Sequence, residues 1–166
     1  MANNERKRQI SEILDISRSE EDAYEQIGIY EICAGTAKAG WTDKKTGFTL
    51  SPGDIFVEVH LPPRDSKGDF LERTRNADRE LAEYLGHADI KPKIVFGVTY
   101  EYLAKFARDL FEYTIADINI PEKKKKTVED MYTQHSPRHN RGIPMGEIVA
   151  IYQTTDNFIR RNTKPQ

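Results

Sequence analysis

The clearest pattern of apolar and polar positions along the chain is the alternation over residues 55–61. One set of alternating positions is aliphatic: Ile55, Val57, Val59 and Leu61. The other set contains Glu58 and His60. Successive side chains of a strand point to opposite faces, so we expect a strand with one core face and one face that carries polar chemistry.

Helices and strands are expected to alternate along the rest of the chain. Apolar residues at helical spacing predict two short helices before residue 26, a short terminal helix after Thr154, and helices over 70–85 and 103–110. Strands are expected at 27–33, 94–100, 113–120 and 147–152, with at most a short strand at 48–50. The run 94–100 is almost continuously apolar, which is typical of a strand covered on both faces.

This order predicts one α/β (α+β) domain that spans residues 1–166. We expect a single-layer mixed sheet of about five to seven strands flanked by helices. A chain of 166 residues is long enough to bury one core. Three segments are distinct within it: an N-terminal helical segment at 1–26, a polar, lid-like insertion at 121–146 and a charged tail at 162–166.

The charge balance and the cysteine content limit the expected partners. Lys and Arg number 25 against 27 Asp and Glu, so the net charge of -2 favours neither nucleic acid nor an anionic membrane. No stretch approaches the roughly 20 apolar residues that span a bilayer. The single Cys33 excludes an intrachain disulfide and a multi-cysteine zinc site. We therefore expect a soluble, cytoplasmic protein, and the sequence leaves its oligomeric state open.

Glu58 and His60 are the first candidates for chemistry. A carboxylate or an imidazole on the polar face of a central strand can take a proton from an ammonium nucleophile. The alternative is that both residues form the solvated side of a half-exposed strand. Motifs for a nucleophile elbow, a Walker loop, a dinucleotide fingerprint or a zinc protease are absent from the sequence, which removes several enzyme classes.

A second candidate is the basic loop that contains His135, Arg138, His139 and Arg141. Guanidinium groups bind phosphate or carboxylate through two parallel hydrogen bonds, so the loop is expected to hold a small anionic ligand. The alternative is a polar loop with incidental charge. We expect no metal site, because these two histidines have no fixed carboxylate partner. The lysines at 123–126 are interpreted as a solvated surface, with RNA contact as the less favoured alternative.

The order of elements from Gly53 to Tyr152 resembles the second half of the N-acetyltransferase (GNAT) fold. In that family a central strand is followed by a helix that cradles the cofactor, a parallel strand, another helix and two final antiparallel strands. The resemblance implies an acyl-CoA cofactor, such as acetyl-CoA, whose pyrophosphate would lie near Ser66, Lys67 and Gly68.

The same resemblance implies roles for the candidate residues. Glu58 or His60 would be the catalytic base, and the loop at 135–141 would lie near the acceptor substrate. Independently of the resemblance, Trp41 is interpreted either as a core residue or as an aromatic residue of the substrate cleft. The turn at 64–69, however, has one glycine where the family has a glycine-rich turn with free amides. The stretch 106–109 also lacks the Tyr that the family uses as an acid. The chain is therefore interpreted as an acyltransferase, a degenerate relative of one, or a non-catalytic module that binds a small ligand or a protein.

A weaker similarity is to a small uncharacterised domain attached to some bacterial polysaccharide deacetylases. It rests on Pro52-Gly53-Asp54 before a strand that ends Val59-His60-Leu61, and on Val98-Thr99-Tyr100. This similarity implies no activity.

Overall fold

A mixed sheet of six strands forms the centre of the fold, in the order β1-β2-β5-β6-β8-β7. The computed structural model describes residues 7–21, 23–60, 70–135 and 145–163. The strands are β1 Glu25–Ile27, β2 Tyr30–Thr36, β5 Ile55–His60, β6 Ile94–Tyr100, β7 Thr114–Ile115 and β8 Ile148–Thr154. Strands β5 and β6 are parallel, and the other neighbouring pairs are antiparallel. The expected single-layer α+β fold is confirmed.

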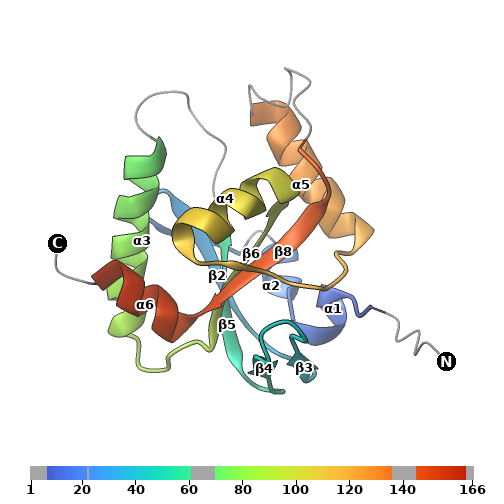
Figure 1. Ribbon diagram of the computed structural model, residues 1–166, viewed down its shortest axis with the longest axis horizontal. Coiled ribbons are helices and arrows are strands. Elements are labelled where there is room, and N and C mark those ends of the chain that lie inside the picture. The colour runs from blue at the N-terminus through green and yellow to red at the C-terminus, as the bar shows by residue number, and fades with distance from the viewer. Residues whose placement is uncertain (1–6, 22, 61–69, 136–144, 164–166) are drawn as a thin grey trace.

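Helices flank this sheet, and a small hairpin extends from it (Figure 1). The helices are α1 Ile10–Ile13, α2 Ser17–Glu20, α3 Phe70–Gly86, α4 Glu101–Phe111, α5 Glu122–His135 and α6 Thr155–Thr163. Strands β3 Trp41–Thr42 and β4 Thr49–Leu50 form the hairpin. Both β5 and β6 end at the upper edge in Figure 1, where α3 and α4 begin.

The sheet separates two apolar clusters, one on each face. Phe56 and Phe96 pack on one face together with α1 and Val128 of α5. Val57 packs on the other face with residues of α3 and with Phe158 of α6. Because Phe56, Val57 and Glu58 are all buried, both faces of β5 are covered. The alternative that Glu58 lies on a solvated face is therefore wrong.

The helix that covers the Glu58 face lies in the segment that the sequence pattern presents as a polar, lid-like insertion. Residues 122–135 of that insertion form α5, a helix of 14 residues. Only Val128 is a buried apolar residue among its described side chains, which explains why helical periodicity is weak there. The predicted strand at 113–120 is also shorter than expected, because only Thr114–Ile115 pairs with β8.

The N-terminal half of the sheet begins with a hairpin. The predicted strand at 27–33 is divided into β1 and β2, with Gly28 at the turn between them. Gly28 has a φ of 57°, a conformation that glycine adopts without steric cost. Among the described residues, no helix combines the length and the apolar character that crossing a bilayer would require.

Candidate functional site

The parallel ladder between β5 and β6 ends before either strand does. Its last pair is Glu58 and Phe96, whereas β5 continues to His60 and β6 to Tyr100. A Cβ atom on Gly97 would lie 3.2 Å from the carbonyl oxygen of Val59. A larger residue at position 97 would therefore crowd the Val59 backbone at the point where the two strands stop pairing.

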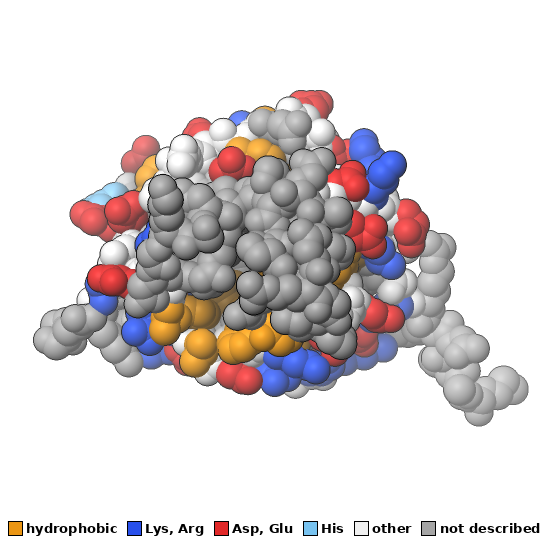
Figure 2. Space-filling view, turned by 90° about the horizontal axis from the view of Figure 1, so that it is seen from above, with side chains coloured by type: hydrophobic (Ala, Val, Ile, Leu, Met, Phe, Trp, Pro, Cys, Tyr) orange, Lys and Arg blue, Asp and Glu red, His pale blue; other side chains and the backbone are white. Residues whose placement is uncertain are grey.

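Apolar side chains are exposed on one side of the edge at which β5 and β6 end. Figure 2 views this edge from above and shows hydrophobic side chains gathered along one side of it, bordered by charged residues. Phe106 and Leu110 of α4 are about half exposed. Large exposed apolar side chains that lie together are typical of surfaces that contact a ligand or another molecule.

Glu58 forms a buried ion pair below this edge. The carboxylate is 2% exposed, and its Oε1 atom accepts a hydrogen bond from Lys124 Nζ of α5 at 2.5 Å. Lys124 is 8% exposed and also lies 3.5 Å from Ser19 Oγ of α2. Within the described residues, Glu58 Oε2 has no hydrogen-bond partner. The pair joins α2 and α5 to the central strand and leaves one buried acceptor atom.

Lys124 is the residue of this buried pair that the sequence interpretation missed. It belongs to the lysine run that was expected to be solvated, and that expectation is wrong at this position. Lys124, Val128 and Met131 are spaced by four and three residues, so they lie on one face of α5. That spacing is the signal in the sequence that could have indicated a buried lysine.

Cys33 lies opposite Glu58 in the antiparallel pair of β2 and β5. Burial is the largest cause that raises the pKa of its thiol. A thiol with a raised pKa holds little of the reactive thiolate at neutral pH. Cys33 is therefore a buried thiol that packs as a small apolar residue, and its surroundings do not favour a role as a nucleophile.

His60 points to the same side of β5 as Glu58, as the alternation predicted. Its Nε2 atom lies 2.6 Å from Met131 Sδ of α5, and its ring stacks on Tyr24 with 5.6 Å between centroids. His60 is half-buried and lies at the last position of β5. The structure therefore brings the two predicted bases together on one face, with Glu58 deeper and His60 at the edge.

Trp41 belongs to a different environment. Its ring meets Tyr152 edge to face, with 5.7 Å between centroids, and it packs against the same core as α1. The Tyr152 hydroxyl donates a hydrogen bond to the buried carboxylate of Asp43. Trp41 is the first residue of β3 in the small hairpin and is partly buried against this core. The aromatic contacts described for it do not include Glu58 or His60.

The other predicted site residues lie mostly beyond what the structure describes. Ser66, Lys67, Gly68, Arg138, His139 and Arg141 lie outside the described residues. His135 is the last residue of α5, and its side chain is likewise not described. The predicted cofactor turn and anion-binding loop therefore stay predictions.

Searches for related proteins gave no family assignment. The chain matches no protein-family model, no curated protein and no solved structure.

Proposed function

We propose that this chain is a degenerate GNAT-like protein that binds acyl-CoA or another small anionic ligand and does not use Glu58 as a catalytic base. The observation that carries the proposal is the buried contact between Glu58 and Lys124. A catalytic base must reach the proton that it removes. Glu58 is covered and already accepts a hydrogen bond from an ammonium group, so its role in this proposal is to anchor α5.

The arrangement of the sheet supports a ligand at the ends of β5 and β6. The parallel pair β5 and β6, joined through α3, is followed by α4 and two strands that pair antiparallel, β7 and β8. This is the succession that the GNAT resemblance implies. Beyond Glu58 and Phe96, the backbone groups of β5 and β6 that face each other are outside the parallel ladder. They can therefore form hydrogen bonds to a ligand instead.

Thermal unfolding with acetyl-CoA tests this proposal. Ligand at a hundredfold excess over its dissociation constant should stabilise the protein by about 2.7 kcal/mol. Gly97→Ala places a methyl group against the Val59 carbonyl and should reduce the stabilisation. Gly86→Ala is the matched control, because a Cβ there meets nothing within 4 Å. Absence of any shift with millimolar acetyl-CoA or coenzyme A would refute acyl-CoA as the ligand.

The predicted basic loop gives a second test of ligand class. Replacement of Arg138 and Arg141 by alanine together should weaken binding of an anionic ligand, whereas Glu58→Gln should leave binding unchanged. The opposite pattern, with binding retained in the arginine variant and lost in the Glu58 variant, would contradict the basic loop as the anion site and would assign ligand binding to Glu58.

Acyl transfer with His60 as the base is the second candidate function. The observation in its favour is that His60 is half-buried at the end of β5, beside the edge where a ligand would bind. Release of free coenzyme A from acetyl-CoA, measured with a panel of primary amines, tests it. His60→Gln should abolish amine-dependent release and keep the thermal shift with acetyl-CoA.

The proposed ligand is an intracellular metabolite, so we also place the protein in the cytoplasm. The single thiol of Cys33 supports that location, because a buried free cysteine requires no oxidising compartment.

A further inference from the structure

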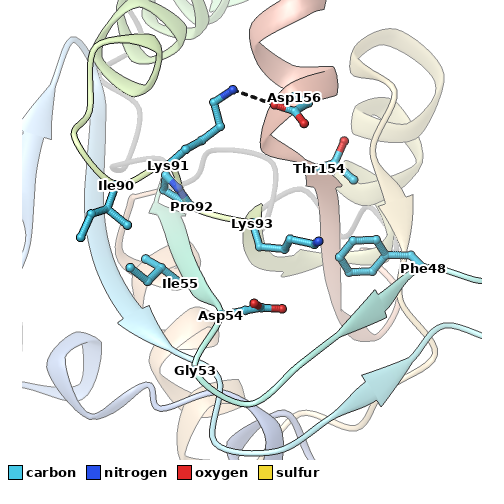
Figure 3. A pocket seen from close by; sticks show the side chains of 10 residues that line it. All are labelled: Phe48, Gly53, Asp54, Ile55, Ile90, Lys91, Pro92, Lys93, Thr154 and Asp156. Carbon is cyan, nitrogen blue, oxygen red and sulfur yellow. Dashed lines mark hydrogen bonds and ion pairs between the residues drawn. The ribbon is translucent and has the colours of Figure 1, made fainter.

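A cavity of about 570 Å³ opens at the opposite edge of the sheet, where β5 and β6 begin. Cavities that hold small molecules measure roughly 300–1,000 Å³. Its walls come from the turn before β5, the segment 90–93 before β6, Phe48 of the hairpin region, and the junction of β8 with α6. Figure 3 shows these side chains around the opening.

The charges that line the cavity are balanced. Lys91 Nζ binds Asp156 Oδ1 at 2.8 Å, so these two groups neutralise each other at the rim. The other two charged residues that line the cavity are Lys93 and Asp54. Among the residues that the structure describes, none forms an ion pair with Lys93, and Asp54 Oδ2 accepts a hydrogen bond from the Ser51 N–H at 2.7 Å. Figure 3 shows the ammonium and the carboxylate projecting into the same opening from neighbouring strand starts.

Apart from Gly53 and Thr154, the remaining residues of the wall are apolar. The Phe48 ring packs against Tyr152, with 5.4 Å between centroids, and Pro92 is buried. Ile55 and the exposed Ile90 extend this apolar surface. A ligand that fits the cavity should therefore combine an apolar body with groups that satisfy one cation and one anion.

We propose that this cavity binds a small zwitterion with an apolar body, either a free α-amino acid or a short peptide. Its ammonium group would lie at Asp54, its carboxylate at Lys93, and its side chain against Phe48, Ile55 and Pro92. A purely anionic ligand would face the Asp54 carboxylate, and a purely cationic one would face Lys93. A zwitterion meets both groups with opposite charge. This site is separate from the one proposed at the ends of β5 and β6.

Isothermal titration calorimetry with the full chain tests the proposal. L-leucine, L-phenylalanine and the dipeptide Leu-Leu carry both charges, whereas leucinamide and N-acetyl-leucine each lack one. We expect the zwitterions to bind about tenfold or more tightly than the single-charge analogues. Tighter binding of Leu-Leu assigns the ligand to peptides, and tighter binding of leucine assigns it to free amino acids.

Two variants connect the binding to these residues. Lys93→Met keeps the aliphatic stem and removes the ammonium group, and Asp54→Asn keeps an oxygen that can accept the Ser51 hydrogen bond. Each should weaken zwitterion binding by about tenfold or more without changing the melting temperature of the free protein. The matched exposed substitutions Lys126→Met and Asp130→Asn should bind as the wild type does.

The proposal would be overturned by any of three results. The zwitterions could show no heat of binding at ligand concentrations of about 10 mM, at which even a weak site would be occupied. The single-charge analogues could bind as tightly as the zwitterions. Lys93→Met and Asp54→Asn, folded with unchanged melting temperatures, could keep wild-type affinity.

Discussion

Asp78 of α3 is a buried carboxyl group whose surroundings oppose its ionisation. It is 2% exposed, and the Tyr30 hydroxyl donates a hydrogen bond to its Oδ1 atom at 2.6 Å. Arg161 Nη2 of α6 lies 3.8 Å from Oδ2. Burial is the largest effect and raises the pKa of Asp78 from 3.8 to about 6, although the Tyr30 hydrogen bond and Arg161 both act to lower it.

Asp78→Asn removes this ionisation and preserves an oxygen that can accept the Tyr30 hydrogen bond. In the wild type, the folded chain keeps the Asp78 proton up to about pH 6, whereas the unfolded chain releases it near 3.8. The stability that arises from this difference is fully present below about pH 4 and is lost as the pH rises through about 6. At about 1.4 kcal/mol per pKa unit, the loss is about 3 kcal/mol.

Urea unfolding followed by far-UV circular dichroism, between about pH 4 and pH 8, measures this effect. The unfolding free energy of Asp78→Asn minus that of the wild type should increase by about 3 kcal/mol from about pH 4 to pH 8, because only the wild type loses stability as the pH rises. The change with pH is the diagnostic quantity, because any constant cost of the asparagine cancels from it.

Asp109→Asn is the matched control, because Asp109 is an exposed carboxylate that pairs with exposed Arg108. Its unfolding free energy should follow the wild-type curve. The reasoning would be refuted if the curves of Asp78→Asn and the wild type ran parallel over the whole range. That result would mean that Asp78 ionises in the folded protein as readily as in the unfolded chain.

Three further predictions concern the buried groups. Lys124→Met leaves the buried Glu58 carboxylate without its cation and should lower the free energy of unfolding in urea by about 3–5 kcal/mol. Adding Glu58→Gln should restore part of that loss. A loss below about 1 kcal/mol would contradict a buried pair. Tyr30→Phe removes a hydrogen bond that favours the ionised form of Asp78, so carbon NMR titration should show a higher pKa for the Asp78 carboxyl. An unchanged pKa would exclude the hydrogen bond between Tyr30 and Asp78. Phe158 is fully buried in α6, so Phe158→Ala should lower the free energy of unfolding by about 3–5 kcal/mol in the same urea assay. A change of less than about 0.5 kcal/mol would show that Phe158 lies outside the core.

The central part of the fold could be predicted from the sequence because its elements follow simple periodicities. The alternation over 55–61 corresponds to β5, and the apolar run at 94–100 coincides with β6. Helical spacing also located α3, including its end at Gly86. These elements bury apolar side chains against apolar neighbours, so the spacing of apolar residues within each segment is enough to predict whether it forms a helix or a strand.

Helix α5 and its contact with the sheet could not be predicted in that way. Its docking onto β5 uses the ammonium group of Lys124 and the carboxylate of Glu58, and each of these residues indicates a solvated position when it is considered alone. The pairing depends on two residues separated by 66 positions, which no local pattern connects. Sequence reasoning therefore identified Glu58 as a candidate base, with a solvated strand face as the alternative, and did not find its buried pair with Lys124.

Glu58 and His60, which the sequence presents as equivalent bases, have different surroundings in the structure. Both lie on one face of β5, but Lys124 covers Glu58, whereas His60 occupies the last position of the strand beside Met131. A buried ion pair contributes little net stability over an apolar pair, yet removal of one partner is costly, so the pair fixes where α5 docks more than how strongly it docks. In that position α5 also contributes Met131, which holds the His60 ring at the end of the strand. Glu58 therefore fixes the position of α5 on the sheet, and His60 is the side chain of the two that the proposed ligand would contact.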